Sequence, residues 1–304
     1  MLRAIVLGAG AGGGFPQWNS AGPGCRRARS GDPAAKPRSQ ASLAVSADGE
    51  RWLLVNASPD LRAQMAATPA LHPRPEPLRN SPIAAIALTG AEVDTIAGLL
   101  NLRERQAFRL YGTPTSLAVL AENPIFRALN PEFVTREVMP LHTAFAPVDG
   151  QGAPLGLTLE AYPVPGKVPL FAEGAGDPGL AEDGEAVGLA ISAGGAALHY
   201  IPGCAMMTPA LAERLRGAAC VLFDGTLYTD DEMIVAGAGP KTGRRMGHMS
   251  MTETMAAFAP LGVARRIFVH INNTNPALLD DSPERAALAA AGWDVAEDGM
   301  EIAL

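Results

Sequence analysis

The glycine-rich run near the N-terminus is the feature that most constrains how this chain can fold. It begins at Val6 and reads VLGAGAGGGFPQWNSAG, with Gly8, Gly10 and Gly13 in the spacing G-x-G-x-x-G after a short apolar stretch. A dinucleotide-binding turn needs a helix directly after such glycines. Pro16 follows instead, disfavours helical geometry in the residue before it, and precedes no amphipathic stretch. We therefore expect no NAD site, and interpret the run as a tight backbone turn or as a loop that lines a pocket.

Short apolar runs alternate with helix starts along the rest of the chain. An Asp-Gly pair between two β-like runs predicts a hairpin over 41–56, and a second hairpin is predicted around 298–299. Serine or threonine directly before proline indicates helix starts at Ser58, Thr208 and Ser282. Hairpins beside β-α pairs favour an α/β fold of two mixed sheets flanked by helices over one doubly wound parallel sheet.

Composition excludes several classes of function. The 304 residues are 48% hydrophobic and 18% charged, which allows a large core, and no apolar run is long enough to span a bilayer. A net charge of −7 argues against a general nucleic-acid groove or an anionic membrane surface as partner. Three cysteines make no disulfide framework, and no signal-peptide pattern is present. We expect a single cytoplasmic domain over 1–304, without nucleic-acid or membrane partners.

Acids and histidines stand where predicted core elements give way to loops. Asp224 and His270 end apolar runs, His248 precedes a predicted helix, and Glu92 and Asp94 follow another strand. Strand ends collect at one edge of such folds, and imidazole with carboxylate suits iron, zinc or manganese. Two histidines and a carboxylate are typical of non-haem iron, and further carboxylates are typical of hydrolytic metal pairs. Taken singly, each residue also fits a structural role in a turn or a core.

Seven sequence blocks stand in order along almost the whole chain: VLGAGAGGGFPQWN, WLLVNASPDLR, YIPGCA, LFDGT, KTGRRMGH, FVHINNTNP and DSPERA. Together they resemble the pyrroloquinoline quinone (PQQ) biosynthesis protein B family. That resemblance implies the metallo-β-lactamase fold, an αββα sandwich. It also implies a role in making PQQ, a redox cofactor built from a glutamate and a tyrosine of a precursor peptide.

The resemblance implies an iron-dependent oxygenase that hydroxylates the tyrosine ring of a Glu-Tyr-derived precursor with dioxygen. A single iron(II) would be held by His248, His270 and either Asp94 or Asp224, with Glu92 as a further candidate ligand. The first four of these residues would also be the catalytic ones. Two alternatives stay open: a non-catalytic carrier or transport accessory protein for PQQ or its precursor, and a metal-dependent hydrolase.

The substrate would be a small molecule or dipeptide with carboxylate groups, and a homodimer is compatible with this interpretation. Lys241, Arg244 and Arg245 precede His248 and are candidates to pair with the substrate carboxylates, unless they form a solvated loop. Two asparagines after His270 would orient the ligand or build the turn, and two glycines would line the pocket. These four residues are Asn272, Asn273, Gly12 and Gly13.

The chain departs from the family pattern at two places. The family usually has a Cys-x-Cys-x-x-Cys run that holds a structural zinc, whereas here Ser20 and Gly22 leave only Cys25. One thiolate does not hold that ion, so we expect the structural zinc to be absent and the loop over 19–40 to be looser. Thr95 also stands where the family usually has a histidine, and threonine is a poor ligand for iron(II) or zinc.

Overall fold

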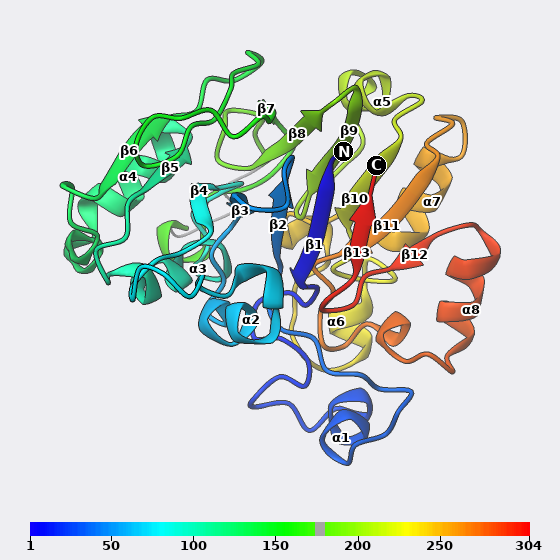
Figure 1. The fold of residues 1–304 in the computed structure, drawn as a ribbon. Helices are drawn as coiled ribbons and strands as arrows, with labels where there is room; N and C mark the ends of the chain where they lie inside the picture. Colours follow the sequence, from blue (N-terminus) through cyan, green and yellow to red (C-terminus); the bar gives the residue numbers. More distant parts are fainter. Residues whose placement is uncertain (174–179) are drawn as a thin grey trace.

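Two β-sheets lie face to face between two groups of helices (Figure 1). The computed structural model describes residues 1–173 and 180–304. The strands in this part are β1 (Arg3–Gly8), β2 (Ser42–Ser46), β3 (Trp52–Val55), β4 (Ile83–Ala87), β5 (Phe108–Gly112), β6 (Val134–Val138), β7 (Thr158–Pro163), β8 (Val187–Ala193), β9 (Ala196–Ile201), β10 (Cys220–Asp224), β11 (Arg265–Val269), β12 (Asp294–Val295) and β13 (Glu301–Ala303). The α-helices there are α1 (Pro23–Arg29), α2 (Leu61–Ala67), α3 (Val93–Ile96), α4 (Pro114–Glu122), α5 (Pro209–Leu215), α6 (Glu232–Val235), α7 (Met251–Phe258) and α8 (Pro283–Ala290).

Both sheets are mixed, and each has parallel strands in one half. In the described residues the first sheet has the order β13-β1-β2-β3-β4-β5-β6, parallel from β3 to β6. The second has the order β12-β11-β10-β9-β8-β7, parallel from β12 to β9. The predicted α/β architecture of two mixed sheets flanked by helices is confirmed.

Strand periodicity builds three apolar layers. Along β10, Leu222 packs between the sheets, while Val221 and Phe223 pack against the outer helices. Alternate side chains of β4 separate in the same way: Ala85 lies between the sheets and Ile86 under the helices of the first sheet. Because side chains alternate along a strand and both faces of each sheet are covered, central strands such as β3 and β4 are buried and apolar along their whole length.

Hydrogen bonds at the helix starts confirm some of the local predictions. Thr208 and Ser282 cap α5 and α8 with their side chains, each followed by proline. Ser58 does not cap a helix: α2 begins at Leu61, and the Ser58 hydroxyl bonds to Gln64 instead. The residue types that cap helices also form local turns, so the motif misplaced this boundary by a few residues.

The predicted second hairpin is wrong, although the first is confirmed. β2 and β3 pair antiparallel around the Asp-Gly turn. The last two strands instead enter different sheets: β12 pairs with β11, and β13 pairs with β1 beside the N-terminus (Figure 1). Asp298 lies in the crossing between them, where its carboxylate accepts hydrogen bonds from the backbone N–H groups of Ala9 and Ser39.

The glycine loop after β1 joins the two sheets. Gly10 bridges to Gln40 and to Ile271, and the N–H of Ala11 donates to the Ile271 carbonyl at 2.9 Å. The next helix, α1, begins only at Pro23 and was not predicted from the sequence. The loop therefore places bare backbone beside the end of β11 and does not open a helix.

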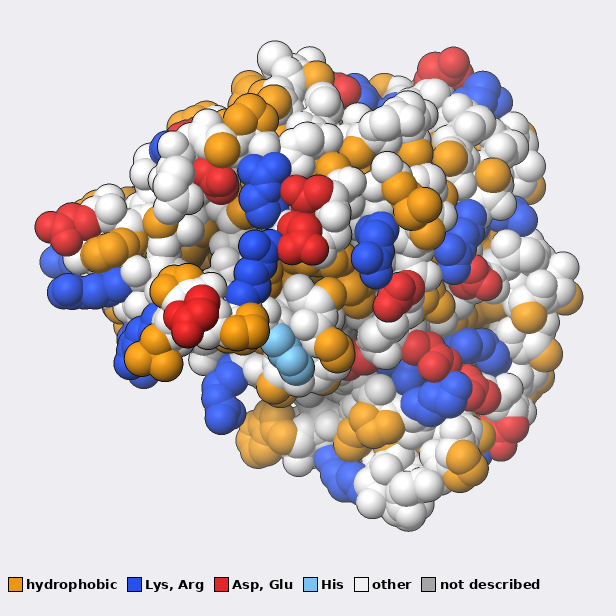
Figure 2. Space-filling view, viewed as in Figure 1, with side chains coloured by type: hydrophobic (Ala, Val, Ile, Leu, Met, Phe, Trp, Pro, Cys, Tyr) orange, Lys and Arg blue, Asp and Glu red, His pale blue; other side chains and the backbone are white. Residues whose placement is uncertain are grey.

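The visible surface mixes charges of both signs. On the face shown in Figure 2, basic and acidic side chains are interspersed and form no continuous basic surface. Across residues 1–173 and 180–304, the structure contains no helix with both the length and the apolar character needed to cross a membrane.

Candidate functional site

A cavity of about 880 Å³ opens where the carboxyl ends of the two parallel halves meet. Asn56 and Thr89, which follow β3 and β4, line it from the first sheet. Thr226 and His270, which follow β10 and β11, line it from the second. Its volume lies within the range usual for small-molecule sites.

Asp224, the last residue of β10, is the most enclosed polar side chain here, with 0% of its surface exposed. Its Oδ1 accepts hydrogen bonds from the backbone N–H of Thr226 at 3.0 Å and from the Thr226 hydroxyl at 2.7 Å. Its Oδ2 accepts from the backbone N–H of Cys204 at 2.9 Å and contacts His248 Nδ1 at 2.8 Å. Four partners hold this carboxylate in place.

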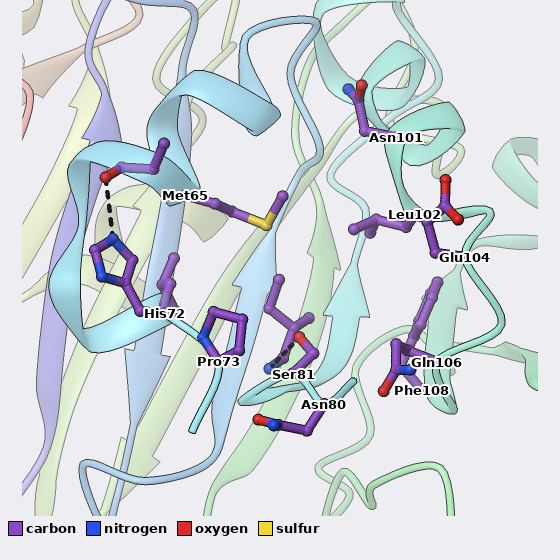
Figure 3. A pocket seen from close by; sticks show the side chains of 13 residues that line it. Met65, His72, Pro73, Asn80, Ser81, Asn101, Leu102, Glu104, Gln106 and Phe108 are labelled. Atoms are coloured by element: carbon purple, nitrogen blue, oxygen red, sulfur yellow. Dashed lines mark hydrogen bonds between the residues drawn. The ribbon is translucent and has the colours of Figure 1, made fainter. Parts of the chain in front are cut away.

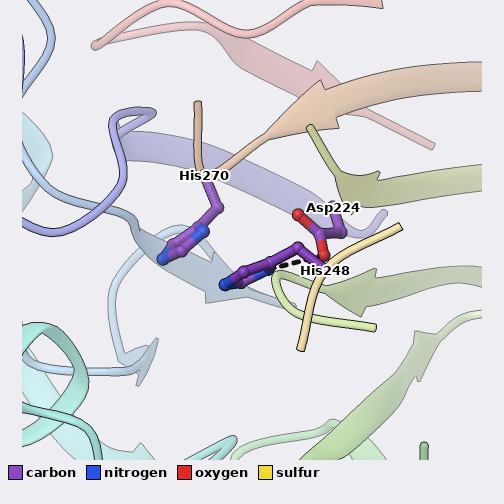
Figure 4. Close-up of side chains that lie close together, drawn as sticks. All are labelled: Asp224, His248 and His270. Atoms are coloured by element: carbon purple, nitrogen blue, oxygen red, sulfur yellow. Dashed lines mark hydrogen bonds and ion pairs between the residues drawn. The ribbon is translucent and has the colours of Figure 1, made fainter. Parts of the chain in front are cut away.

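The Thr226 hydroxyl lies between the two histidines. Its Oγ1 is 3.1 Å from His248 Nδ1 and 2.8 Å from His270 Nδ1. The two imidazole rings stack, with centroids 5.3 Å apart and planes inclined at 25°. Asp224, His248 and His270 each offer a ligand atom within 4.8 Å of those of the other two (Figure 4).

His270 links this cluster to the first half of the site. Its Nε2 lies 2.9 Å from Oδ2 of Asp94, which α3 contributes. Burial opposes the charge on Asp94, but the contact with His270 outweighs it, so the pKa of Asp94 lies below its usual value. The same contact raises the pKa of His270 in spite of its burial. Without a metal ion, the contact therefore favours the charged form of each partner.

Backbone geometry also singles out His270. Its φ is +59°, a left-handed conformation that is uncommon for residues other than glycine. The Thr226 hydroxyl contacts its carbonyl at 3.0 Å, and the N–H of the following Ile271 donates to the Ala9 carbonyl at 2.9 Å. Strained conformations of this kind gather at functional sites because the surrounding structure has to hold them.

Two lysines and Glu92 line one wall of the cavity. Lys167 forms ion pairs with Glu173 and, at 3.7 Å, with Glu92. Lys241 contacts the other oxygen of Glu173 at 3.2 Å. The hydrogen bond from Lys167 is the main reason why the pKa of Glu173 lies below its usual value. The two lysines therefore place positive charge at the cavity wall, and the Glu173 carboxylate partly neutralises it.

Some of the predicted binding residues line the cavity and others do not. Within the part that it describes, the cavity lining includes Gly12, Gly13, Glu92, Lys241 and Asn272. A Cβ atom on Gly12 would lie 3.6 Å from Oδ2 of Asp94, so this glycine faces the acid directly.

Three other predicted residues lie outside this lining. Arg244 is exposed and forms an ion pair with Glu253, and the backbone N–H of Arg245 donates to Thr242. Asn273 donates to Gln17 and accepts a long contact from the Cys25 thiol at 3.6 Å, so it connects α1 to the loop after β11.

Sequence reasoning missed Thr226, Lys167 and Glu173. Thr226 follows Asp224 by two residues, and the Asp-Gly-Thr sequence by itself indicates only a turn. Lys167 and Glu173 lie in a stretch without a clear strand or helix pattern, so no signal in the sequence pointed to them. Lys167 reaches the cavity lining, with Glu173 in contact with it, because the chain after β7 folds back over α3, where the backbone N–H of Leu170 donates to Glu92 at 3.1 Å.

A second, smaller cavity of about 260 Å³ lies at the edge of the first sheet, lined by α2 and by β4 and β5 (Figure 3). Met65, Leu71 and Leu102 give it a largely apolar wall. The nearby imidazole of His72 contacts the carbonyl of Ala66 at 3.0 Å. Among the described residues, the lining of this smaller cavity includes one histidine and one acid, His72 and Glu104, whereas the larger cavity is lined by two histidines and three acids and is therefore the candidate functional site.

Comparisons with known proteins agree with this geometry. The family model for the beta-lactamase superfamily domain matches residues 51–271. Coenzyme PQQ synthesis protein B of Gluconacetobacter diazotrophicus is 58% identical over 306 aligned positions, which cover 99% of both chains. The protein of the same name from Gluconobacter oxydans is 52% identical and covers 100% of this chain and 99% of its own.

Solved structures extend the comparison to three dimensions. The crystal structure of Zn²⁺-bound PqqB from Methylobacterium extorquens has a TM-score of 0.95 at 50% identity and covers 99% of this chain and 100% of its own. A diphosphatase of the PhnP family has a TM-score of 0.68 at 20% identity, covering 100% of this chain and 98% of its own. At that identity the second likeness shows the fold alone.

The zinc-bound relative corrects the cofactor prediction. We expected iron(II) without a structural zinc, but a protein that is 50% identical is Zn²⁺-bound, and none of these comparisons shows iron. The expectation rested on missing thiolates at Ser20 and Gly22. Imidazole and carboxylate groups also bind zinc, so the lack of these thiolates is not enough to exclude that ion.

Full-length identity above 50% with several proteins of one name goes far beyond a shared fold. The near-superposition on PqqB extends that agreement to the whole described structure. The chain belongs to the coenzyme PQQ synthesis protein B family, within the beta-lactamase superfamily, and its role is in PQQ biosynthesis.

Proposed function

We propose that the chain hydroxylates the tyrosine ring of a Glu-Tyr-derived PQQ precursor in a metal-dependent reaction with dioxygen. The observation that carries this proposal is that two stacked imidazoles, His248 and His270, line a cavity of small-molecule size, where His270 also contacts the Asp94 carboxylate. In the balanced reaction one atom of dioxygen enters the ring. The other leaves as water, with two electrons and two protons supplied by an external reductant.

The donor set fits a divalent transition metal ion. His248, His270 and Asp94 would hold it, and a redox-active ion bound there would supply the activation of dioxygen. The ion pair between Asp94 and His270 supports this fit, because two ligands already face each other at 2.9 Å. Metal binding would replace the proton that they now share.

We assign substrate recognition to the two lysines at the wall of the cavity, Lys167 and Lys241. Lys167 and Lys241 carry positive charge to the cavity, and both are engaged by Glu173. A substrate carboxylate would take the place of the Glu173 carboxylate, since both offer the same oxygen acceptors to the ammonium groups. Asn272 lines the same cavity and would orient the polar end of the ligand.

The proposal is tested by reconstitution. The metal-stripped protein is loaded with zinc(II), iron(II) or manganese(II) and mixed with the precursor, a reductant and isotopically heavy dioxygen. We expect incorporation of one heavy oxygen atom with a redox-active ion and none with zinc. His270→Ala should abolish incorporation, whereas His72→Ala, which removes an exposed histidine outside this cavity, should not. Turnover that is equal with zinc and with redox-active ions would contradict the proposal.

One observation favours the carrier function as a second candidate. Thr95 stands where the family usually has a histidine, and its hydroxyl is turned to the Glu92 carbonyl at 2.7 Å, so this position supplies no imidazole to a metal ion. A metal-independent affinity for PQQ, together with no oxygen incorporation under any metal, would support a carrier and refute the hydroxylase.

A further inference from the structure

The Asp224 carboxylate has little capacity left to bind anything else. A carboxylate offers about four lone-pair directions, and Asp224 uses two on each oxygen. Its partners are the backbone N–H groups of Cys204 and Thr226, the Thr226 hydroxyl and His248 Nδ1, all at 2.7–3.0 Å. With 0% of its surface exposed, it has no open side toward the cavity.

The space between Asp224 and the two histidines is also filled. The Thr226 Oγ1 atom lies 2.7 Å from Asp224 Oδ1, 3.1 Å from His248 Nδ1 and 2.8 Å from His270 Nδ1. An ion at that point would have to displace a hydroxyl whose backbone is itself tied to Asp224. The proximity of the three side chains therefore does not by itself create a metal position among them.

Proton counting determines which ring nitrogens remain available. A hydroxyl has one proton, and that of Thr226 points toward Asp224 Oδ1 or the His270 carbonyl, both of which only accept. Thr226 Oγ1 consequently accepts from His270, whose Nδ1 carries a proton. His248 Nδ1 faces Asp224 Oδ2, which also only accepts, so that nitrogen is protonated too.

Both histidines thus turn their Nε2 atoms away from Asp224. Figure 4 shows the far nitrogens of the two rings on the same side, opposite the Asp224 carboxylate. His270 Nε2 meets Asp94 Oδ2 on that side at 2.9 Å. A carboxylate that fixes the tautomer of a metal-binding histidine is a recurring arrangement around metal ions.

We infer that Asp224 is a positioning residue and not a metal ligand: it holds His248 with Nδ1 protonated, so that Nε2 of His248, Nε2 of His270 and Asp94 form the ligand set. This inference rests on the metal-dependent site proposed above and refines it. It also assigns Thr226 a role, because the same hydroxyl accepts from His270 and donates within the cluster.

The test uses zinc alone, without substrate. In the zinc-loaded wild-type protein, nitrogen-15 NMR of the histidine rings should show Nδ1 protonated and Nε2 metal-bound for His248 and His270. Asp224→Asn should still bind about one zinc per chain, with an affinity lowered about 10- to 100-fold. The cobalt(II)-substituted variant should keep the coordination spectrum of the wild type. Asp294→Asn, which removes an exposed carboxylate from β12, is the matched control and should bind zinc as the wild type does.

Three results would overturn the inference: metal bound to Nδ1 of His248, a cobalt(II) spectrum of Asp224→Asn with one ligand fewer, or zinc affinity unchanged in that variant. The ring measurement needs no variant, so it decides the question even if Asp224→Asn fails to fold. If the wild-type protein gives these zinc results but does not hydroxylate the precursor with any metal ion, the proposed function is contradicted and the ligand assignment still stands.

Discussion

The two sheets contribute unequally to the site. The second sheet supplies Asp224, Thr226 and His270 from the ends of two adjacent parallel strands, joined by hydrogen bonds of 2.7–3.0 Å. The first supplies Asp94 from a four-residue helix, and Thr95 beside it bonds back to Glu92. Strand ends in a packed sheet hold side chains more firmly than a short helix in a loop does, because more of their backbone is paired. Most of the preorganisation of the site therefore comes from the second sheet.

The largest effect should come from removing an imidazole of the second sheet. We expect His270→Ala to lower zinc affinity by about 1,000-fold, roughly 4 kcal/mol. Asp94→Ala should cost less, because two imidazoles remain on well-held elements. Isothermal titration of the metal-stripped proteins with zinc measures both. An equal or larger loss for Asp94→Ala would show that the first sheet contributes as much as the second.

The second sheet also contains a histidine, His199, whose pKa is shifted in the opposite direction to that of His270. Burial, with Arg214 adding to it, lowers the pKa of His199 to about 4, whereas Asp94 raises that of His270. His199 lies 2.9 Å from the Tyr162 hydroxyl. It stays neutral in the folded protein at a pH where the unfolded chain binds a proton, so stability is lost as the pH falls below about 6.5 toward 4.

We expect this histidine to contribute roughly 2–3 kcal/mol to the fall in the free energy of unfolding between about pH 7 and pH 4. His199→Gln should flatten that part of the profile, measured by urea unfolding at a series of pH values. His72→Gln, at an exposed position, is the control. A profile unchanged by His199→Gln would refute the assignment.

The first sheet's weaker contribution can be strengthened directly. Thr95→His restores an imidazole where the family usually has one, beside Asp94 and at the cavity wall. We expect zinc affinity to rise about 10-fold, roughly 1.4 kcal/mol. Thr95→Val removes the same hydroxyl without adding a ligand and should leave affinity near that of the wild type. Equal affinities for the two variants would mean that this position does not reach the metal.

The smallest effect concerns the cavity wall. Glu173→Gln removes the charge that engages Lys167 and Lys241, so both ammonium groups become available to a ligand carboxylate. We expect PQQ to bind about 3- to 10-fold tighter, measured by fluorescence titration at low salt. Glu50→Gln, which removes an exposed carboxylate that pairs with Arg74, should change nothing. Weaker binding by Glu173→Gln would show that Glu173 is part of the binding surface and not a competitor for it.

Periodicity and short motifs were enough to predict the architecture. Alternating apolar side chains in the strands and the caps at Thr208 and Ser282 are local signals, and the structure bears them out. The last two strands, β12 and β13, show what such local signals do not predict. Asp298 and Gly299 are equally suited to a hairpin and to a crossing between sheets, and only the partners β1 and β11 decide which one forms.

The residues of the candidate site also fall into those that local sequence signals predict and those that they do not. Asp94, Asp224, His248 and His270 could be named from the sequence because each follows or precedes a recognisable element, and the seven family blocks place them in a known fold. Lys167 and its partner Glu173 could not, since Lys167 reaches the cavity only when an irregular stretch packs over α3. The sequence by itself determined which chemical groups are present and which elements carry them. Tertiary structure decided which nitrogen of each imidazole faces the cavity, because hydrogen bonds between residues 22 to 176 positions apart set that choice.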